Sequence, residues 1–501
     1  MHHLIKNKRP VNRNKFLSYF FMVFLFLCIK PSYTQKLTLS SEEKLSGRIS
    51  DVDILGKNNF GTVLYYYGNN NNQLAILDEQ MNPKVRKDIS VQSESIQSVQ
   101  LLNDKIVVLY VQNSYQVQYL KAKILNGNLS EVNTLILDSL SINLDNKNTF
   151  YAKTSPDNSK LLTFTIVRNK NNLHIQFVIF NQNIEFISRN IFTVTDKDGA
   201  SVRSVKINNN GYVSAVFGYQ DKWSNDDYDF NNYLINYYNA EQKTIYEAEI
   251  KNTNTVYKKL ITDLNLEDNL LYVLCGYRNT VNKDNIGFYY QILDLRTNAV
   301  LVQKYLNITE EDVKDSKTYD FKNWKDKVYT LMPKKIIPRS DGGFLFVIEG
   351  EFSYLKQERI SNYNNYYNPV FGSIPQQIRS TQYNTIGDVM IFSINKDGSL
   401  LWKKNIYKSQ QSEDDDAIFS SFTLFEADNV LKFIYNEDIF SSGNFVEYNI
   451  NPIGKSKRVS IINSEKEKLN LIPKKAVQLD ANTLMIPSQN KRNIRFLQIV
   501  Y

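Results

Sequence analysis

Short runs of aromatic and β-branched residues, separated by polar turns, recur along nearly the whole chain. Such runs favour strands, and each pair reads as a hairpin: one strand, a polar turn, and a second strand that leaves it. The predicted hairpins are Gln73–Ile89, Gln116–Leu137, His174–Phe192, Tyr233–Ile250, Phe288–Tyr305, Val389–Ile406 and Phe445–Ile462. An eighth unit, Ile494–Tyr501, contains the first strand alone.

The spacing of these hairpins predicts the architecture. Successive units begin 43 to 59 residues apart, except for one interval of 101 residues. Two further strands precede each hairpin, as Ile96–Leu102 and Ile106–Val111 do in the second unit. Turns rich in Asn, Asp and Gly, such as Asn126-Gly127 and Asp397-Gly398, close the hairpins. A loose repeat of four strands is typical of an all-β β-propeller.

The truncated eighth unit predicts how the propeller closes. Its strands are Ala476–Leu479, Thr483–Ile486 and Ile494–Tyr501, and an outer strand is missing. We expect Lys36–Leu39 to pair beside Ile494–Tyr501 and to close the ring. Eight blades are favoured, with seven as the alternative, and residues 35–501 are expected to form one domain. A pair of β-sandwiches is the competing fold.

The first 34 residues resemble a secretory signal peptide. A basic leader precedes the apolar run Phe16–Ile29, and small residues precede a cleavage position before Gln35. The run of 14 residues is short for a membrane span, and a retained anchor is the alternative. We therefore expect an exported protein, located in the periplasm or at the cell surface.

The leader also carries most of the net charge. The whole chain has a formal net charge of +8, and six Lys and Arg residues of the leader contribute to it without any acid. The remaining +2 leaves no basic cluster, so a nucleic-acid partner is not expected. Cys275 is the single cysteine after the leader and is expected to be a buried apolar residue.

Some outer hairpins resemble the quinoprotein-type propeller repeat, in which a strand, an Asp, a Gly turn and a Trp follow one another. The segment Ile391–Trp402 is the best match, and Leu293–Asn298 is a weaker one. This resemblance implies the fold and not a quinone cofactor, and no cofactor is expected. The stretch Gly342–Asn436 also resembles uncharacterised exported propellers of Bacteroidota, a family that implies no established activity.

The long connections of the predicted blades indicate a working face. In a propeller the connections between second and third strands emerge on the same face as the connections between blades. The long predicted connections are all of these two kinds: Tyr219–Asn232, Gly276–Gly287, Gly350–Gly387, Ile308–Lys335 and Lys408–Ala417. Insertions of this kind are where binding residues collect.

Aromatic residues in these connections are the candidate binding residues. We select Tyr219, Trp223, Tyr228, Trp324, Tyr354, Tyr363, Tyr366, Tyr367 and Tyr383. Aromatic side chains suit stacking on sugar rings or gripping a protein, because they bring contact area at low entropic cost. The alternative is that these rings pack the connections onto the scaffold, and about half are expected to do so.

Catalytic and metal sites find little support in the sequence. His174 is the single histidine after the leader and lies in a predicted strand, which excludes a histidine-rich zinc site. The segment Asp227–Asn231 has calcium-loop spacing but lacks the expected Gly and Glu. Carboxylate-only chemistry stays open, since glycoside hydrolysis needs two acids at a fixed separation. The acids that could reach the face are Asp226, Asp229, Glu349, Glu351, Asp414 and Glu437.

The sequence thus predicts a non-catalytic exported propeller that binds a protein or glycan partner of the cell envelope. The insertion 350–387 is expected to be the main contact. The alternative is a carboxylate-dependent glycoside hydrolase or polysaccharide lyase on the same face.

Overall fold

The computed structural model describes residues 35–501 apart from short gaps, and the leader lies outside the described residues. The gaps are residues 48, 69–70, 91–94, 142–148, 196–198, 220–228, 231, 266–268, 317–322, 361–376, 428 and 440–442. Within the described residues the strands form eight sheets, and neighbouring strands in each sheet pair antiparallel.

Sheets one to four follow one another along the chain, each with strands in chain order from the inside outwards. Sheet one contains β3 (Ile49–Asn58), β4 (Gly61–Gly68), β5 (Gln73–Leu77) and β6 (Pro83–Asp88). Sheet two contains β7 (Ser95–Leu102), β8 (Lys105–Ser114), β9 (Val117–Leu125) and β10 (Glu131–Ser141). Sheet three contains β11 (Phe150–Thr154), β12 (Lys160–Arg168), β13 (Asn172–Asn181) and β14 (Phe186–Thr195). Sheet four contains β15 (Ala200–Ile207), β16 (Val213–Tyr219), β18 (Asn232–Asn239) and β19 (Thr244–Lys251).

Sheets five to seven continue the same order, with additional short elements. Sheet five contains β17 (Asp229–Phe230), β20 (Thr255–Asn265), β21 (Leu270–Asn279), β22 (Ile286–Asp294) and β23 (Val300–Asn307). The helices α2 (Glu310–Val313) and α3 (Trp324–Tyr329) lie in the connection to sheet six. Sheet six contains β24 (Leu331–Pro338), β25 (Phe344–Ile360), β26 (Gln377–Ile394), β27 (Leu400–Ile406) and β28 (Gln410–Glu413). Sheet seven contains β29 (Thr423–Ala427), β30 (Val430–Asn436), β31 (Asn444–Ile450) and β32 (Ser456–Asn463).

Sheet eight joins the two ends of the described chain. It contains the 3-10 turn η1 (Pro473–Lys475) at its entry, then β33 (Val477–Gln478), β34 (Thr483–Asn490) and β35 (Asn493–Val500). β1 (Lys36–Leu39) pairs with β35 on the side where an outer strand would follow, with Lys36 opposite Val500. β2 (Glu43–Lys44) also pairs with β35. The pairing predicted between Lys36–Leu39 and the last strand is therefore present.

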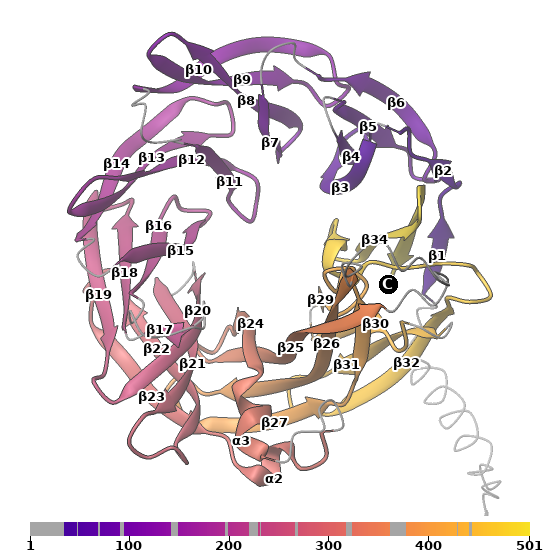
Figure 1. Cartoon of the computed structure of the whole chain (residues 1–501). Coiled ribbons are helices and arrows are strands. Elements are labelled where there is room, and N and C mark those ends of the chain that lie inside the picture. The colour runs from indigo at the N-terminus through magenta and orange to yellow at the C-terminus, as the bar shows by residue number, and fades with distance from the viewer. Residues whose placement is uncertain are drawn as a thin grey trace, which may run out of the picture.

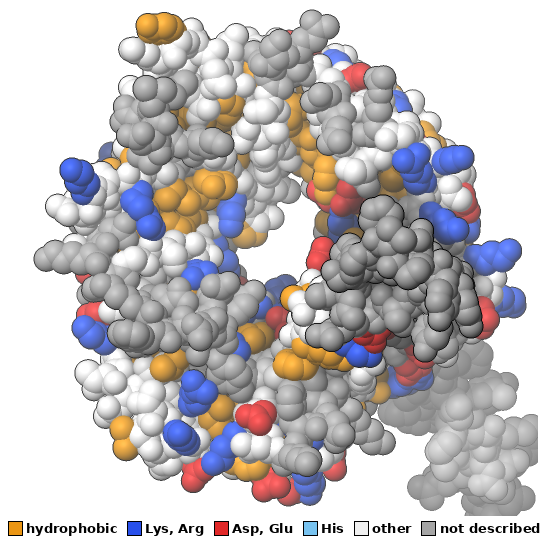
Figure 2. Space-filling view, in the orientation of Figure 1, with side chains coloured by type: hydrophobic (Ala, Val, Ile, Leu, Met, Phe, Trp, Pro, Cys, Tyr) orange, Lys and Arg blue, Asp and Glu red, His pale blue; other side chains and the backbone are white. Residues whose placement is uncertain are grey.

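The sheets stand around a central opening, with their first strands nearest to it (Figure 1). The opening persists in the space-filling view, where charged side chains of both signs lie along its rim (Figure 2). The architecture is all-β and consistent with a propeller, as predicted. The seven complete hairpins predicted from the sequence are present as the third and fourth strands of sheets one to seven.

The core consists of apolar clusters that lie between neighbouring sheets. Val347 and Ile391 of sheet six pack with Phe433 and Val446 of sheet seven in one such cluster. Similar clusters join each other pair of neighbours in chain order. A further cluster joins sheet eight to sheet one, with Phe496 and Leu64 among its members. Burial of these faces stabilises the arrangement, since each fully buried aliphatic or aromatic side chain contributes roughly 1.5–3 kcal/mol.

The turns between the third and fourth strands of the sheets are held by the side chain of an Asp or Asn residue more than by a glycine. The carboxylate of Asp78 accepts the backbone N–H groups of Gln80 and Asn82, and it fixes the turn between β5 and β6. The left-handed residue of this turn is the buried Met81, with φ of 66°. In the Asn126-Gly127 turn the left-handed residue is Leu129, with φ of 70°, and not Gly127.

Cys275 and His174 have ordinary structural surroundings. Cys275 is fully buried in β21, and burial raises the pKa of its thiol well above the usual value. The ring nitrogens of His174 lie 3.0 Å from Nδ2 of Asn169 and 2.9 Å from Oγ1 of Thr193.

Candidate functional site

The connections between second and third strands and those between sheets leave the molecule on one side, here called the long-connection face. This follows from the antiparallel order of strands within each sheet. The described parts of the long connections at sheets five to seven all lie on this face, and they include α2, α3 and β28.

The insertion of sheet six is a β-arm, although the sequence suggested a loop. β25 and β26 continue past the edge of the sheet, so that Glu351–Ile360 pairs with Gln377–Ile386. A register shift between Glu349 and Glu351 separates the arm from the sheet. β28 pairs with the base of the arm as a third strand, with Gln410 opposite Ile386. At this base β26 has a strand on each side, β25 on one and β28 on the other.

The arm presents a pair of tyrosines directly across its two strands. Tyr354 is opposite Tyr383, and their ring centroids are 5.2 Å apart at an interplanar angle of 11°. Phe352 extends the row, with its ring centroid 5.7 Å from that of Tyr354. Tyr354 is 45% exposed and the neighbouring Leu355 is 67% exposed. Phe352 and Tyr383 are half-buried, so Tyr354 is the exposed member of the row. A stacked aromatic row on paired strands, open to solvent at one ring, is a surface suited to a binding partner.

The other predicted aromatic residues fall into two groups. Tyr219 and Trp324 are half-buried and pack against the core clusters, and the hydroxyl of Tyr219 donates to the carbonyl of Thr195 at 3.3 Å. The remaining residues lie outside the described residues: Trp223, Tyr228, Tyr363, Tyr366 and Tyr367. Of the selected residues, the structure thus brings together Tyr354 and Tyr383.

A buried ion-pair network lies at the base of the arm. The side chain of Glu349 is completely buried, and its Oε1 lies 2.8 Å from Nζ of Lys408, which is also buried. The hydroxyl of Ser421 donates to Oε2 of Glu349 at 2.6 Å. Nζ of Lys334 lies 3.0 Å from the same oxygen. These contacts connect sheet six with the chain that leads to sheet seven.

The network continues toward the central opening. Lys334 pairs with Glu351 as well as with Glu349, so one ammonium group lies between the two carboxylates. Nζ of Lys259, from the first strand of sheet five, lies 3.5 Å from Glu351. These outer members keep partial solvent exposure, whereas Glu349 has none.

Burial and the charges of the network shift the pKa values of its members in opposite directions. Burial would raise the pKa of Glu349, but Lys408 and Lys334 outweigh burial and hold that pKa below its ordinary value. Burial lowers the pKa of Lys408, and Glu349 opposes this effect. Burial likewise lowers the pKa of Lys259, which Glu351 opposes. Glu349 is therefore a carboxylate at neutral pH and not a proton donor.

The other candidate acids that the structure describes, Asp414 and Glu437, have partners of their own outside this network. Glu437 forms an ion pair with Arg458 at 2.6 Å, and Oδ1 of Asp414 accepts the backbone N–H of Gln382 at 2.8 Å. Asp226 and the side chain of Asp229 lie outside the described residues, as does most of the segment Asp227–Asn231, which was not expected to bind calcium.

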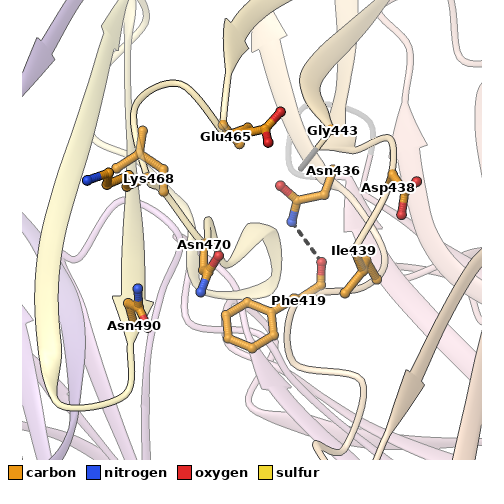
Figure 3. Close-up of a pocket in the computed structure, with 11 residues that line it drawn as sticks. Phe419, Asn436, Asp438, Ile439, Gly443, Glu465, Lys468, Asn470 and Asn490 are labelled. Carbon is orange, nitrogen blue, oxygen red and sulfur yellow. Dashed lines mark hydrogen bonds between the residues drawn. The ribbon is translucent and has the colours of Figure 1, made fainter. Parts of the chain in front are cut away.

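A cavity of about 290 Å³ opens between sheets seven and eight on the long-connection face. Phe419, Asn436 and Asp438 form one side, and Lys468 and Asn470 belong to the other (Figure 3). A second cavity of about 430 Å³ lies on the opposite face between sheets six and seven, beside Trp402 and Asn429. In the described part of the chain, no group of three or more His, Cys, Asp and Glu residues could hold a metal ion. No helix among the described residues is long and apolar enough to cross a membrane.

The network lysines and the cavity residues were not found from the sequence. Lys334 and Lys408 are separated by 74 positions, and nothing near either residue indicates a buried carboxylate. The one available signal was Glu349 itself, an acid inside the otherwise apolar stretch Phe344–Gly350. A buried carboxylate requires a cationic partner, although the sequence does not say which one.

Comparisons with known proteins give no family. No protein-family model matches the chain, and no curated protein matches it. Among solved structures it is similar to an oligogalacturonate lyase in complex with manganese, with 9% identity, a TM-score of 0.38, and coverage of 92% of this chain and 98% of that chain. It is also similar to a variant of the Synechocystis apocarotenoid oxygenase, with 9% identity, a TM-score of 0.28, and coverage of 58% and 65%. At this identity nothing about activity follows, and the resemblance to exported Bacteroidota propellers stays a prediction.

Proposed function

We propose that the protein is a non-catalytic, exported, eight-bladed propeller that binds a protein or glycan partner of the cell envelope through its long-connection face. The observation that carries this proposal is the β-arm, which presents Tyr354 and Tyr383 as a stacked pair, with Tyr354 exposed and Tyr383 half-buried. The single domain, the export and the periplasmic or surface location belong to the same proposal.

Rigidity is what makes the arm a suitable binding element. Three paired strands hold its base, and the completely buried pair of Glu349 and Lys408 anchors the strand from which it extends. An aromatic pair that is already ordered loses little conformational entropy when a partner binds. Tyrosine also offers both an apolar ring and a hydroxyl to a protein or a sugar surface.

Two observations support the eight-bladed ring within this proposal. The described strands form eight sheets, and β1 lies on β35 in the place of an outer strand. The apolar cluster between sheets eight and one corresponds to those between the other neighbouring sheets. A closed ring leaves no open sheet edges between blades.

The rival function is a carboxylate-dependent glycoside hydrolase or polysaccharide lyase on the same face. Its support is that Glu349 and Glu351 share the ammonium group of Lys334. Hydrolysis by two carboxylates needs one of them protonated, with a raised pKa. The lowered pKa and full burial of Glu349 count against this role.

The test uses the mature chain and a variant with a shortened arm. Residues 353–384 are replaced by a two-residue Asn-Gly turn, which suits the ends of paired strands and leaves Glu351 in place. Both proteins are used for affinity capture from native envelope extract and for glycan arrays. The proposal expects partners that the mature chain captures and the shortened variant does not.

Point variants make the result specific to the tyrosines. The double change Tyr354→Ser and Tyr383→Ser is expected to weaken capture at least about tenfold, as for interface anchors in general. Tyr115→Ala is the matched control, because Tyr115 is 97% exposed and lies at the connection between β8 and β9, on the same face but in sheet two. Equal capture by the mature chain and the shortened variant would refute the proposal.

A further inference from the structure

We propose that two copies of this chain join through the open edge of the arm, residues 352–360 of β25, so that their arms form one continuous sheet. The two edges pair in antiparallel order, with Gln357 of one copy opposite Gln357 of the second copy. This contact uses the edge of the arm and not its face, so it goes beyond the function proposed above and does not depend on it.

The arm has one covered edge and one open edge. β28 pairs with β26 from Ile386 to Tyr383. Asp414 continues this cover, because its backbone N–H donates to the carbonyl of Gln382 at 2.9 Å and its carboxylate accepts the N–H of Gln382 at 2.8 Å. On the other side, no described strand pairs with β25 beyond Glu351. An uncovered strand edge is a template for pairing with another chain.

The contacts at the base show which backbone groups point out of the open edge. The N–H of Glu351 donates to the carbonyl of Thr330 at 2.9 Å, so it points away from β26. Gln382 lies opposite Leu355, and its N–H and C=O bond on the side away from β25. The backbone groups of Leu355 therefore also point away from β26. Because this direction alternates along a strand, the N–H and C=O of Gln357 face the open edge too.

The charges of the edge select one register of pairing. Pairing of this edge with itself must set outward-facing residues opposite one another. Registers centred on Lys356 or on Glu358 set like charges directly opposite, which is unfavourable. A register centred on Leu355 brings no opposite charges directly together. The register centred on Gln357 sets Lys356 opposite Glu358 of the second copy, and it does so twice.

The local geometry suits these charge pairs. In the selected register Lys356 and Glu358 form non-hydrogen-bonded pairs, whose Cα atoms lie about 4.5 Å apart and whose side chains are close. Within one copy the two side chains are 53% and 58% exposed and 2.6 Å apart, and pairing joins them into a square of alternating charges. Charges on an edge strand usually discourage pairing with other chains. Here they discourage the registers that bring like charges together.

The joined sheet leaves the faces of both arms accessible. Directly opposite residues of an antiparallel pair lie on the same face, so the stacked pairs of Tyr354 and Tyr383 from both copies lie on one side of the sheet. Two equal sites on one surface raise the apparent affinity for a partner with repeated epitopes. This consequence rests on the proposed function, whereas the pairing itself does not.

The test is sedimentation velocity with residues 35–501 and charge-reversal variants. The unchanged chain should form a dimer. Lys356→Glu alone and Glu358→Lys alone each set like charges opposite, and each should weaken the dimer about tenfold or more. The double change Lys356→Glu and Glu358→Lys should restore it, because opposite charges meet again. For the same reason a mixture of the two single variants should form a mixed dimer.

Cross-linking tests the register. Gln357→Cys sets two thiols on residues whose Cα atoms lie about 5.5 Å apart, within the range of a disulfide, so oxidation should link the two copies. Leu355→Cys sets the thiols roughly 13 Å apart along the strands and should link them poorly. Cys275 is fully buried and does not compete.

Three controls separate this contact from other effects. Lys314→Glu reverses a lysine of similar exposure, 50%, that pairs with Glu311 in α2, and it should leave the dimer unchanged. Tyr383→Ser alters the proposed binding face and not the open edge, so it should keep the dimer while partner capture falls. The shortened-arm variant should be a monomer. Thermal unfolding of each variant checks that the fold is retained.

Any of three results overturns the proposal. The first is an unchanged chain that stays monomeric at high micromolar concentration. The second is association that Lys356→Glu or the shortened arm leaves as strong as before. The third is Leu355→Cys linking as readily as Gln357→Cys.

Discussion

At the scale of single residues, Glu349 determines how sheet six is anchored. It is an ionised carboxylate without solvent contact, and its stability in that position depends on Lys408, Lys334 and Ser421. Buried ion pairs are often no more stabilising than well-packed apolar residues, but removing one partner leaves the other charge buried alone. The energetic effect of this network should therefore appear when it is broken on one side.

We predict that Glu349→Gln lowers the free energy of unfolding by about 3–5 kcal/mol, because the ammonium group of Lys408 stays buried without its counter-charge. Urea denaturation measures this change. The matched control is Glu437→Gln, which breaks the exposed pair with Arg458 and should change stability by less than about 1 kcal/mol.

A double variant checks the cause. Replacing both Glu349 and Lys408 by methionine removes the charges together and should recover most of the lost stability. If Glu349→Gln lowered the free energy of unfolding no more than Glu437→Gln does, the buried pair of Glu349 and Lys408 would not anchor sheet six.

At the scale of elements, the β-arm is distinct from the sheet that carries it. The ten paired residues of each arm strand span about 30 Å along the strand direction. The interior part of the same strands, by contrast, includes Ile391, which is fully buried in the cluster between sheets six and seven. The two parts of one strand should therefore contribute very differently to stability.

We predict that replacing residues 353–384 by an Asn-Gly turn changes the midpoint of thermal unfolding by less than about 4 °C. Ile391→Ala, in the interior part of β26, should lower the free energy of unfolding by about 2–5 kcal/mol. Calorimetry compares the two variants directly. A large loss of stability from the shortened arm would identify it as a structural plug and not a binding element.

The hairpins were predictable from the sequence, whereas the arm and the sites were not. Strand, Asx turn and strand are local signals, and Asp78 fixes its turn through its own neighbours. The arm depends on pairing between Glu351–Ile360 and Gln377–Ile386, whose polar side chains give no apolar pattern. The ion-pair network depends on residues such as Lys259, Lys334 and Lys408, which meet only after separate sheets have packed.

At the scale of the whole molecule, the first and last described strands lie in one sheet. β1 covers the edge of β35 through four residue pairs, from Lys36 opposite Val500 to Leu39 opposite Leu497. β2 covers the other end of the same strand. Without them β35 would present its backbone N–H and C=O groups to solvent.

We predict that a chain that begins at residue 45 self-associates, because the uncovered edge of β35 can pair with another copy. Size-exclusion chromatography with light scattering compares it with residues 35–501. Adding a peptide with the sequence of residues 35–44 should reverse the association. A truncated chain that behaved as the longer one does would argue against the role of β1 as the edge cover.

The pairing of β1 with β35 also has a consequence for the order in which the protein can fold. Lys36 and Val500 are separated by almost the entire sequence, and contacts between such distant residues form slowly. Seven sheets can assemble from their own neighbouring strands as the chain emerges. In sheet eight, β1 cannot pair until β35 has been synthesised. If synthesis stops before β35, β1 has no strand to pair with. The pairing of the first strand therefore forms only after the last strand has been made.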